Sequence, residues 1–300
     1  MRAAIATCAE VPNLDEDGPL LVQALAHYGI EAEPAIWDDP AVAWPSYDLV
    51  VIRSTWDYPS RWRSFLDWID AVETPCRLLN PADVVRWNID KRYLRSLARH
   101  GIPVVPTQWL EDFSASVNLT DKWRRTDEVV VKPAVSAGSK DTRRFARNES
   151  DAAAALARDI LASGRPVMLQ PYMGSVDDRG ETALLYFGGR YSHAIRKGPL
   201  LAVGDALEAG LFRQEEIEPR VASDEERALG ELVLDRLPFE RDRLAYARVD
   251  LVQGAGGTPS VIEIELIEPS VFLQHAPGAA DRFASALAAG ARRGENGAAR

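Results

Sequence analysis

Two short segments near the C-terminus decide how this chain folds: Ala247-Arg248-Val249-Asp250-Leu251 and Val261-Ile262-Glu263-Ile264-Glu265-Leu266. Side chains of a β-strand alternate between its two faces, so Arg248 and Asp250 share one face, as do Glu263 and Glu265. The turn-rich stretch 253–259 lies between the segments and is typical of a hairpin. The pattern predicts a β-hairpin with one charged face. The opposite face is apolar and consists of Val249, Leu251, Ile262, Ile264 and Leu266.

The charged face of this hairpin indicates a metal ion. Folding the pair about the middle of the turn places Asp250 opposite Glu263 and Arg248 opposite Glu265, although a bulge would shift this register. Like charges that face each other destabilise a sheet, so three carboxylates on one face favour a bound cation. Ligands that are all oxygen suit magnesium, manganese or calcium. An ordinary hairpin with a solvated polar face would show the same alternation.

The overall composition is that of a small-molecule enzyme. The chain has 300 residues, a net charge of −10 and a pI near 5.0. This charge argues against nucleic-acid binding and against binding to an anionic membrane. No apolar run approaches the ~18 residues of a membrane span, and the N-terminus lacks a signal peptide, so we expect a cytoplasmic protein. Cys8 and Cys76 are too few for a disulfide framework or a metal motif.

The first third of the chain alternates strand and helix signals, which predicts a parallel sheet covered by helices. Strands are expected at 3–7, 33–37 and 48–53, and helices at 19–28 and 58–72. Ligands of such sheets bind at the carboxyl ends of the strands, where Arg53 lies. Further helices are expected at 89–100 with Asn88 as N-cap, 149–162, 224–237 and 279–289. Further strands are expected at 102–107, 128–132 and 167–171, and a hairpin of strands 182–187 and 190–195 around Gly188-Gly189.

Lys132 ends an apolar strand and enters a loop of small residues that includes Ser136, Gly138 and Ser139. A lysine beside backbone N–H groups and hydroxyls can bind phosphate. A lysine at a strand end that simply reaches solvent would have the same sequence. Lys91, early in the helix predicted after Asn88, by itself resembles a surface lysine.

The segment Gln170-Pro171-Tyr172-Met173 follows a strand and contains a proline, so it can form a hinge whose backbone reads the edge of a base. Tyr172 and Met173 would supply apolar walls, and Asp177 or Asp178 could accept hydrogen bonds from ribose hydroxyls. A plain exit from the strand is the alternative.

Lys197 ends a strand, and Arg213 follows the stretch 200–212. Basic residues on a loop of this kind suit a lid over a transferring phosphate, although a solvated surface loop would look similar. The four histidines are scattered along the chain and receive no catalytic role.

The order of these groups along the chain resembles the ATP-grasp superfamily over about residues 80–275. The resemblance implies an α/β fold, α+β in its C-terminal part, with an N-terminal pre-ATP-grasp domain that contains a parallel sheet. The implied domains are residues 1–86 and an ATP-grasp domain at 87–290, with a nucleotide-binding subdomain at about 107–175. The remaining residues, 291–300, have no apolar periodicity and are expected to be disordered.

The resemblance also assigns roles to the candidate residues. ATP phosphates would contact Lys91, Lys132 and the loop after it, residues 170–173 would hold adenine, and Asp177 would hold ribose. Two magnesium ions, or manganese in their place, would lie on Asp250, Glu263 and Glu265, and Arg248 would face the transferred phosphate. The chain departs from the superfamily in two places. It has Glu263-Ile264-Glu265 where Glu-x-Asn is usual, and its loop after Lys132 contains few glycines.

Residues 51–58, 132–142 and 263–270 are most similar to the cycloserine-forming cyclo-ligases, within the glutathione-synthetase-like branch. This resemblance implies an ATP-dependent ligase that activates an amino-acid-like carboxylate as an acyl phosphate. A nitrogen nucleophile then attacks it, within the same molecule for ring closure. Arg53, Glu268 and Ser270 would face the substrate, and a homo-oligomer would be in keeping with related ligases. The alternatives are a small-molecule kinase of ATP-grasp type and an ATP-binding regulator without turnover.

Overall fold

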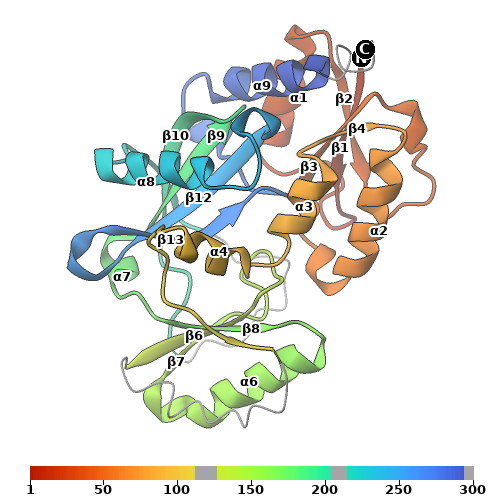
Figure 1. Cartoon of the computed structure of the whole chain (residues 1–300). Coiled ribbons are helices and arrows are strands. Elements are labelled where there is room, and N and C mark those ends of the chain that lie inside the picture. The colour runs from red at the N-terminus through yellow and green to blue at the C-terminus, as the bar shows by residue number, and fades with distance from the viewer. Residues whose placement is uncertain (112–126, 204–214, 294–300) are drawn as a thin grey trace.

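The computed structural model describes residues 1–111, 127–203 and 215–293, in which three β-sheets follow one another along the chain (Figure 1). Arg213 lies outside these residues. The last helix, α9 (Ala279–Arg293), continues through residues 291–293, which were expected to be disordered. Its final turn buries Ala291 and packs Gly290 beside Leu79, so burial extends the helix beyond the predicted end.

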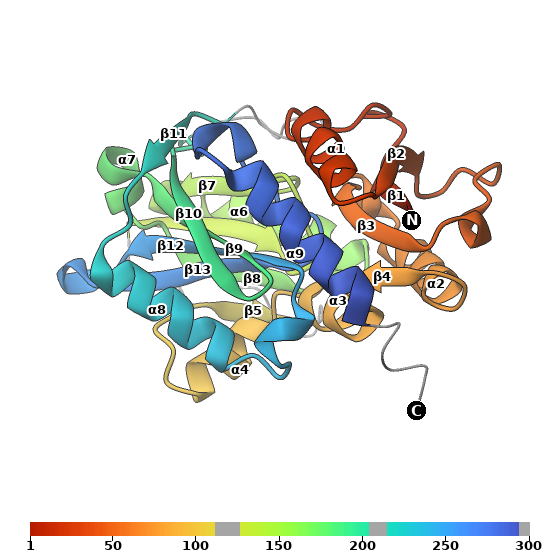
Figure 2. The same cartoon turned by 90° about the horizontal axis from the view of Figure 1, so that it is seen from above.

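The N-terminal sheet is parallel and has the strand order β2 (Glu31–Ile36), β1 (Arg2–Thr7), β3 (Leu49–Ser54), β4 (Arg77–Leu79). Ala3 and Ile5 pack on the side of α1 (Gly18–His27) and α9, whereas Ala4 and Ala6 pack with Phe65 of α2 (Trp62–Glu73). Figure 2 shows α1 and α9 side by side on their face of the sheet. The predicted parallel layer is therefore confirmed, and both of its faces are covered.

The central sheet is antiparallel and has the order β11 (Ile217–Arg220), β10 (Arg190–Lys197), β9 (Glu181–Phe187), β12 (Tyr246–Gln253), β13 (Pro259–Glu265). One face packs on α8 (Asp224–Asp235) and α4 (Tyr93–Arg99), where Val249 and Ile264 meet Val233 and Leu97. The charged side chains of the hairpin therefore point to the other side of the sheet.

The register predicted for the hairpin is confirmed: Asp250 pairs with Glu263, and Arg248 pairs with Glu265. The ladder then shifts, because Leu251 pairs with Val261, which leaves Ile262 as an extra residue on β13. Ile262 packs near Met173 instead of joining the apolar face. Its predicted place on that face is therefore wrong, and the β-bulge is the reason.

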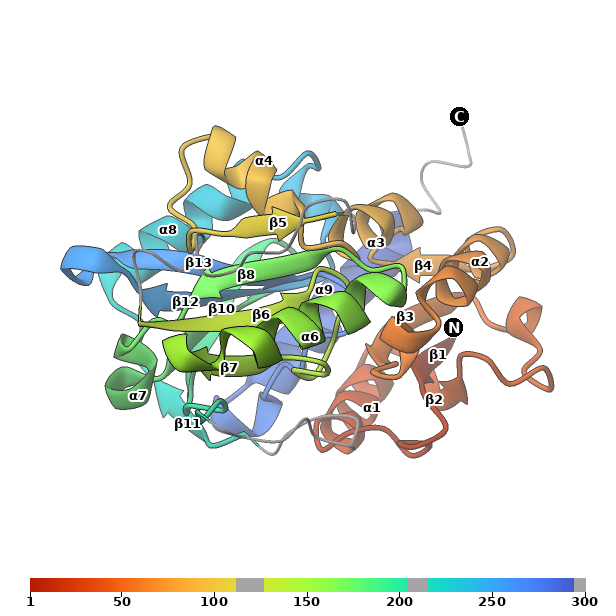
Figure 3. The same cartoon turned by 90° about the horizontal axis from the view of Figure 1, so that it is seen from below.

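The third sheet has the order β5 (Gln108–Leu110), β8 (Val167–Pro171), β6 (Glu128–Pro133), β7 (Arg143–Ala146), and α6 (Ser150–Ala162) covers one face (Figure 3). The short helix α7 (Ser175–Arg179) leads from β8 to β9. Figure 1 shows this sheet on the opposite side of the molecule's centre from α8 and α9, facing the central sheet.

The predicted helix at 89–100 is wrong at its start. Asn88 is the last residue of α3 (Ala82–Asn88), and α4 begins only at Tyr93. The Asn88 amide donates to the carbonyl of Ile264 (2.9 Å) and accepts from the N–H of Leu266 (2.8 Å). A side chain that bridges the backbone of β13 in this way is not available to cap a helix.

The predicted strand at 102–107 is reduced to a single bridge between Val104 and Val261, and β5 begins at Gln108. Pro103 and Pro106 explain the difference, because proline has no N–H to donate to a ladder.

Candidate active site

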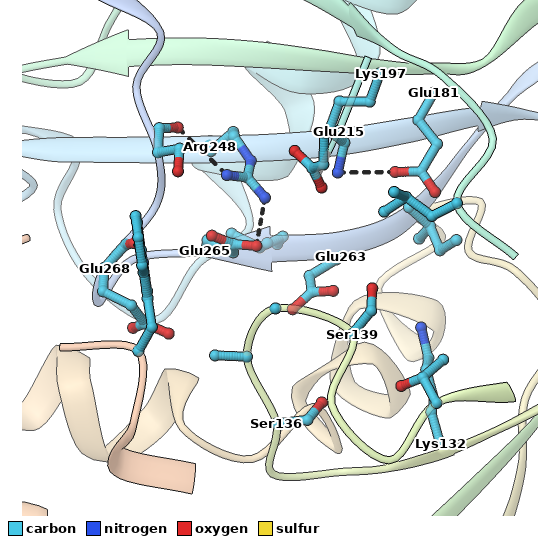
Figure 4. Close-up of a pocket in the computed structure, with 18 of the residues that line it drawn as sticks. Lys132, Ser136, Ser139, Glu181, Lys197, Glu215, Arg248, Glu263, Glu265 and Glu268 are labelled. Atoms are coloured by element: carbon cyan, nitrogen blue, oxygen red, sulfur yellow. Dashed lines mark hydrogen bonds and ion pairs between the residues drawn. The ribbon is translucent and has the colours of Figure 1, made fainter. Parts of the chain in front are cut away.

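A cavity of about 590 Å³ is lined by strands of the central and third sheets and by the loops that follow β1 and β3 of the N-terminal sheet. The nucleotide candidates in this wall come from the turn after α3, the end of β6 and the end of β8. The charged face of the β12–β13 hairpin forms another part of the wall. Figure 4 shows Glu263 and Glu265 projecting from β13, with Glu263 directed toward the loop that carries Ser136 and Ser139. The structure therefore gathers most of the candidates from the sequence around one cavity.

The two predicted phosphate lysines lie on this wall. Lys91 is buried in the turn between α3 and α4, and its Nζ donates to the carbonyl (2.7 Å) and hydroxyl (3.1 Å) of Ser136. The Glu263 carboxylate is 3.0 Å from the same nitrogen. Lys132 is also buried, and burial lowers its pKa below the ordinary value of a lysine. A buried ammonium of this kind is stabilised by an anionic ligand.

The loop after Lys132 has an unusual backbone. Gly138 and Ser139 both have a φ of +58°, and both line the cavity together with Ser136. Ser139 is not a glycine, so its left-handed conformation is strained and has to be maintained by the surrounding structure.

The hinge segment forms the apolar part of the wall. Gln170 is buried, and its side-chain amide donates to the Thr107 hydroxyl (2.9 Å). Tyr172 and Met173 line the cavity with an apolar set that consists of Val105, Val176 and Ile262. A flat apolar slot beside backbone polar groups suits a planar base.

Asp177, the expected ribose ligand, is not among the residues that line the cavity. Its carboxylate accepts hydrogen bonds from Arg144 (3.2 Å) and from the Tyr172 hydroxyl. Glu181, at the start of β9, does line the cavity and lies 2.8 Å from Lys197. Glu181 is not among the residues predicted from the sequence. The predicted β9–β10 hairpin could have revealed it, because that hairpin brings Glu181 opposite Lys197.

Asp250 lies under the cavity wall and is 1% exposed. Its carboxylate is 2.7 Å from the Lys197 ammonium and 2.8 Å from the Arg248 guanidinium. Burial alone would raise the pKa of Asp250, but Arg248 and Lys197 outweigh burial and lower it to about 2. The same carboxylate, together with Glu181, outweighs the effect of burial on Lys197 and raises the pKa of that lysine.

Glu265 accepts a hydrogen bond from Arg248, yet its pKa is raised to about 7. Burial is the main cause, Arg248 opposes it, and the neighbouring carboxylates of Glu263 and Asp250 add to the rise. The three predicted metal ligands are therefore each paired with a cation. Within the described residues, no group of three or more Asp, Glu, His or Cys side chains is arranged to hold a metal ion.

The predicted substrate residues lie at another part of the site. Glu268 is buried at the cavity wall, and the Trp56 indole donates to its backbone carbonyl (3.1 Å). Burial, followed by repulsion from Glu265, raises the pKa of the Glu268 carboxyl to about 8. Ser270 lines the cavity, and its carbonyl accepts a hydrogen bond from Arg248 (3.3 Å). Arg53 does not line the cavity; its guanidinium lies 3.9 Å from the carboxylate of Asp15, which does.

Comparisons with known proteins bear on this geometry. A family model described as the N-terminal domain of the D-cycloserine synthetase DcsG matches residues 3–80. The cycloserine biosynthesis protein DcsG of Streptomyces lavendulae is 39% identical over 95% of this chain and 97% of its own length. The chain belongs to the ATP-grasp ligases.

Solved structures agree with this assignment. The crystal structure of D-cycloserine synthetase DcsG superposes with a TM-score of 0.89 at 37% identity, and the match covers 97% of this chain and 100% of the other. A RimK-domain ATP-grasp protein of Sphaerobacter thermophilus shares the fold with a TM-score of 0.67 at 17% identity, over 97% and 99% of the two chains. The expected fold is confirmed, and this ATP-grasp ligase is an ATP-dependent enzyme.

The charge of the cavity bears on the expected metal in this ATP-grasp ligase. Eight acidic and four basic side chains line the wall, so the anionic triphosphate of ATP would meet an excess of negative charge. Divalent cations between the two would remove that repulsion. Asp250, Glu263 and Glu265 supply oxygen ligands of the type that magnesium binds. Burial and the neighbouring carboxylates raise the pKa of Glu265, and a bound cation would lower it. These three carboxylates would therefore fit magnesium after the lysine and arginine side chains that now pair with them move to the phosphates of ATP.

Within residues 1–111, 127–203 and 215–293 of this ligase, no helix is both long and apolar enough to cross a membrane.

Proposed function

We propose that this ATP-grasp ligase closes a ring within an amino-acid-like substrate, by joining its activated carboxylate to a nitrogen of the same molecule. The proposal is supported above all by the 39% identity with the cycloserine biosynthesis protein DcsG along nearly the whole of both chains. The N-terminal region, which the DcsG family model matches, supplies Trp56 and Tyr58 to the cavity wall beside Glu268.

In the first step, an oxygen of the substrate carboxylate attacks the γ-phosphorus of ATP, and ADP leaves. Lys91, Lys132 and Arg248 would stabilise the charge that spreads over the transferring phosphoryl group. Lys197 would join them after leaving Asp250. Magnesium on Asp250, Glu263 and Glu265 would neutralise further phosphate charge. Residues 170–173 would hold the base, and Glu181 is placed more suitably than Asp177 for the ribose, because it lines the cavity.

In the second step, the nitrogen attacks the acyl carbon and gives up a proton, and phosphate leaves with the former carboxylate oxygen. The Glu268 carboxylate would accept this proton. With a pKa of about 8, Glu268 would act as the base in its ionised form, so this step should speed up as the pH rises toward 8. Arg248, which pairs with Asp250 and Glu265 in the structure without ligands, would turn to the departing phosphate and stabilise its charge.

Product analysis tests this function. The protein is incubated with ATP, Mg²⁺ and O-ureido-D-serine, and ADP, phosphate and the organic product are measured together. Ring closure predicts ADP and free phosphate in equal amounts, with a product that has lost one water relative to the substrate, or cycloserine after loss of its carbamoyl group. A phosphorylated product without free phosphate would instead indicate a kinase. Absence of turnover with this substrate and with paired amino acids would contradict the proposal.

A further inference from the structure

Buried polar atoms without a hydrogen-bond partner gather at one place beside the cavity. Nine such side-chain atoms occur in the described part of the chain, and four of them belong to Asp15, Arg53 and Thr55. Arg53 and Thr55 lie at and just beyond the carboxyl end of β3, and Asp15 lies in the loop after the neighbouring strand β1. Buried polar groups in native proteins are nearly always satisfied, so a cluster of exceptions calls for an explanation.

Asp15 belongs to a run of three acidic residues whose other two members have partners. Asp17 is buried and accepts hydrogen bonds from the backbone N–H groups of residues 271–273, at 3.1, 2.8 and 2.6 Å. Glu16 is exposed and accepts one from the Gln274 amide at 2.9 Å. These contacts explain Glu16 and Asp17 as structural residues, but they leave Asp15 unexplained.

One carboxylate oxygen of Asp15, Oδ1, has no hydrogen-bond partner, and the nearest cation is distant. The nearest guanidinium nitrogen of Arg53 lies 3.9 Å from its carboxylate, which is too far for a hydrogen bond. Arg53 itself is 2% exposed and lies over the rings of Tyr246 and Phe283. An arginine keeps its charge even when buried, so it holds a positive charge beside Asp15. Burial raises the pKa of Asp15, whereas Arg53 and the backbone N–H groups of Gly18 and of Asp15 itself oppose that rise.

Contacts connect Asp15 to the reacting end of the site. Arg248, which would contact the transferred phosphate, donates to the carbonyl of Ser270. Residues 271–273 follow Ser270, and their backbone N–H groups donate to the carboxylate of Asp17. Asp17 is two positions from Asp15 in the chain. Asp15, Ser270 and Arg248 all line the same cavity. In an α-amino acid the ammonium group is separated from the carboxyl carbon by one carbon atom, so the two groups need neighbouring partners.

We propose that Asp15, held in place by Arg53, binds the α-ammonium group of the substrate and thereby selects α-amino acids over carboxylic acids that lack an amino group. The inference rests on the proposed function, because that function places the reacting carboxylate near Arg248. The ammonium would donate to Oδ1, the Asp15 oxygen without a hydrogen-bond partner, and the carboxylate would balance its charge.

Calorimetry on the full chain with Mg²⁺ and a non-hydrolysable ATP analogue tests this assignment. The titrants are two matched pairs: O-ureido-D-serine with its desamino analogue 3-(ureidooxy)propanoate, and D-serine with 3-hydroxypropanoate. Asp15→Asn is predicted to weaken binding of each amino acid roughly 10- to 100-fold and to leave the desamino partners unchanged. Glu16→Gln removes the same charge from the adjacent residue and is predicted to leave the ratio within each pair unchanged. Affinity for the ATP analogue alone verifies that each variant is folded.

Three results would overturn the inference. The first is that Asp15→Asn weakens the binding of both members of a pair equally. The second is that Glu16→Gln changes the ratio of the two affinities within a pair. The third is that the wild-type protein does not bind the amino acid more tightly than its desamino partner in either pair. Turnover of O-ureido-D-serine by the wild-type protein tests the proposed function separately. The ligase function and the ammonium site can therefore fail independently of each other.

Discussion

Glu268 combines burial with a place at the substrate end of the cavity, and its protonation has a measurable effect on the whole protein. Its pKa is about 8 in the folded chain, whereas an unfolded chain has an ordinary glutamate pKa of about 4.3. Between these values the folded protein binds more protons than the unfolded chain does. Its stability therefore falls as the pH rises through this window.

We predict that Glu268→Gln removes this fall in folding stability with rising pH. Glutamine cannot ionise, so the variant should gain thermal stability relative to wild type at pH 8, and the gain should shrink toward pH 5. Thermal unfolding of both proteins without ligands, followed at several pH values, measures the difference. A constant difference at all pH values would show that Glu268 has an ordinary pKa.

The acidic residues of the hairpin should respond differently to neutralisation. Asp250→Asn removes the most deeply buried counter-charge of Arg248 and Lys197 and leaves them only Glu265 and Glu181, which we expect to cost roughly 3–5 kcal/mol of stability. Glu263 lies partly exposed in the cavity, so Glu263→Gln should stay folded while turnover falls at least ~100-fold. Denaturant unfolding and phosphate release check the two effects. Near-normal turnover in Glu263→Gln would rule out the assigned metal site.

At the scale of elements, α8 depends on a close approach to the central sheet. A Cβ at Gly230 would lie 2.1 Å from the Tyr186 hydroxyl and 2.6 Å from Leu184. Alanine in place of glycine normally stabilises a helix interior by about 1 kcal/mol. Here overpacking against a buried tyrosine should outweigh that gain, because such strain costs about 1–3 kcal/mol.

Gly230→Ala is therefore predicted to lower the melting temperature by roughly 2–6 °C. Gly174→Ala is the matched control, because its Cβ would meet no atom within 4 Å and its backbone has an ordinary φ of −56°. Thermal unfolding compares the two variants. A Gly230→Ala protein as stable as wild type would show that α8 has room to move away from the sheet.

The elements also show what a sequence can predict. Alternating strand and helix signals identified the parallel layer, and turn residues between short strands identified both hairpins and the pairing of Asp250 with Glu263. These features leave a local pattern in the sequence. The bulge at Ile262 and the bridging role of Asn88 were not predictable in this way. Both depend on partners distant in the chain: Met173 for the former and the backbone of β13 for the latter.

At the scale of the whole molecule, the order of motifs predicted the fold and the family, because widely separated residues had to converge on one ligand. Asp15 and Glu181 are two lining residues that the sequence did not reveal, because they come from segments without a motif and reach the cavity only in the folded chain. The domain boundary at residue 86 and the oligomeric state stay predictions.

The ion pairs of the cavity predict that metal and nucleotide bind together. Each candidate metal ligand is paired with a lysine or arginine, so Mg²⁺ alone has to break those pairs. Nucleotide phosphates can take over the released cations. We expect at least a ~10-fold tighter Mg²⁺ affinity with an ATP analogue present, a gain of about 1.4 kcal/mol or more. Calorimetry with and without the analogue measures it, and equal affinities would contradict the exchange.

The most direct measurement for the whole account is the stoichiometry of one reaction of the wild-type protein with ATP, Mg²⁺ and O-ureido-D-serine. The account predicts one ADP and one free phosphate for each substrate molecule that closes into a ring. Hydrolysis of ATP without a ring product, or a stable phosphorylated product, would contradict it.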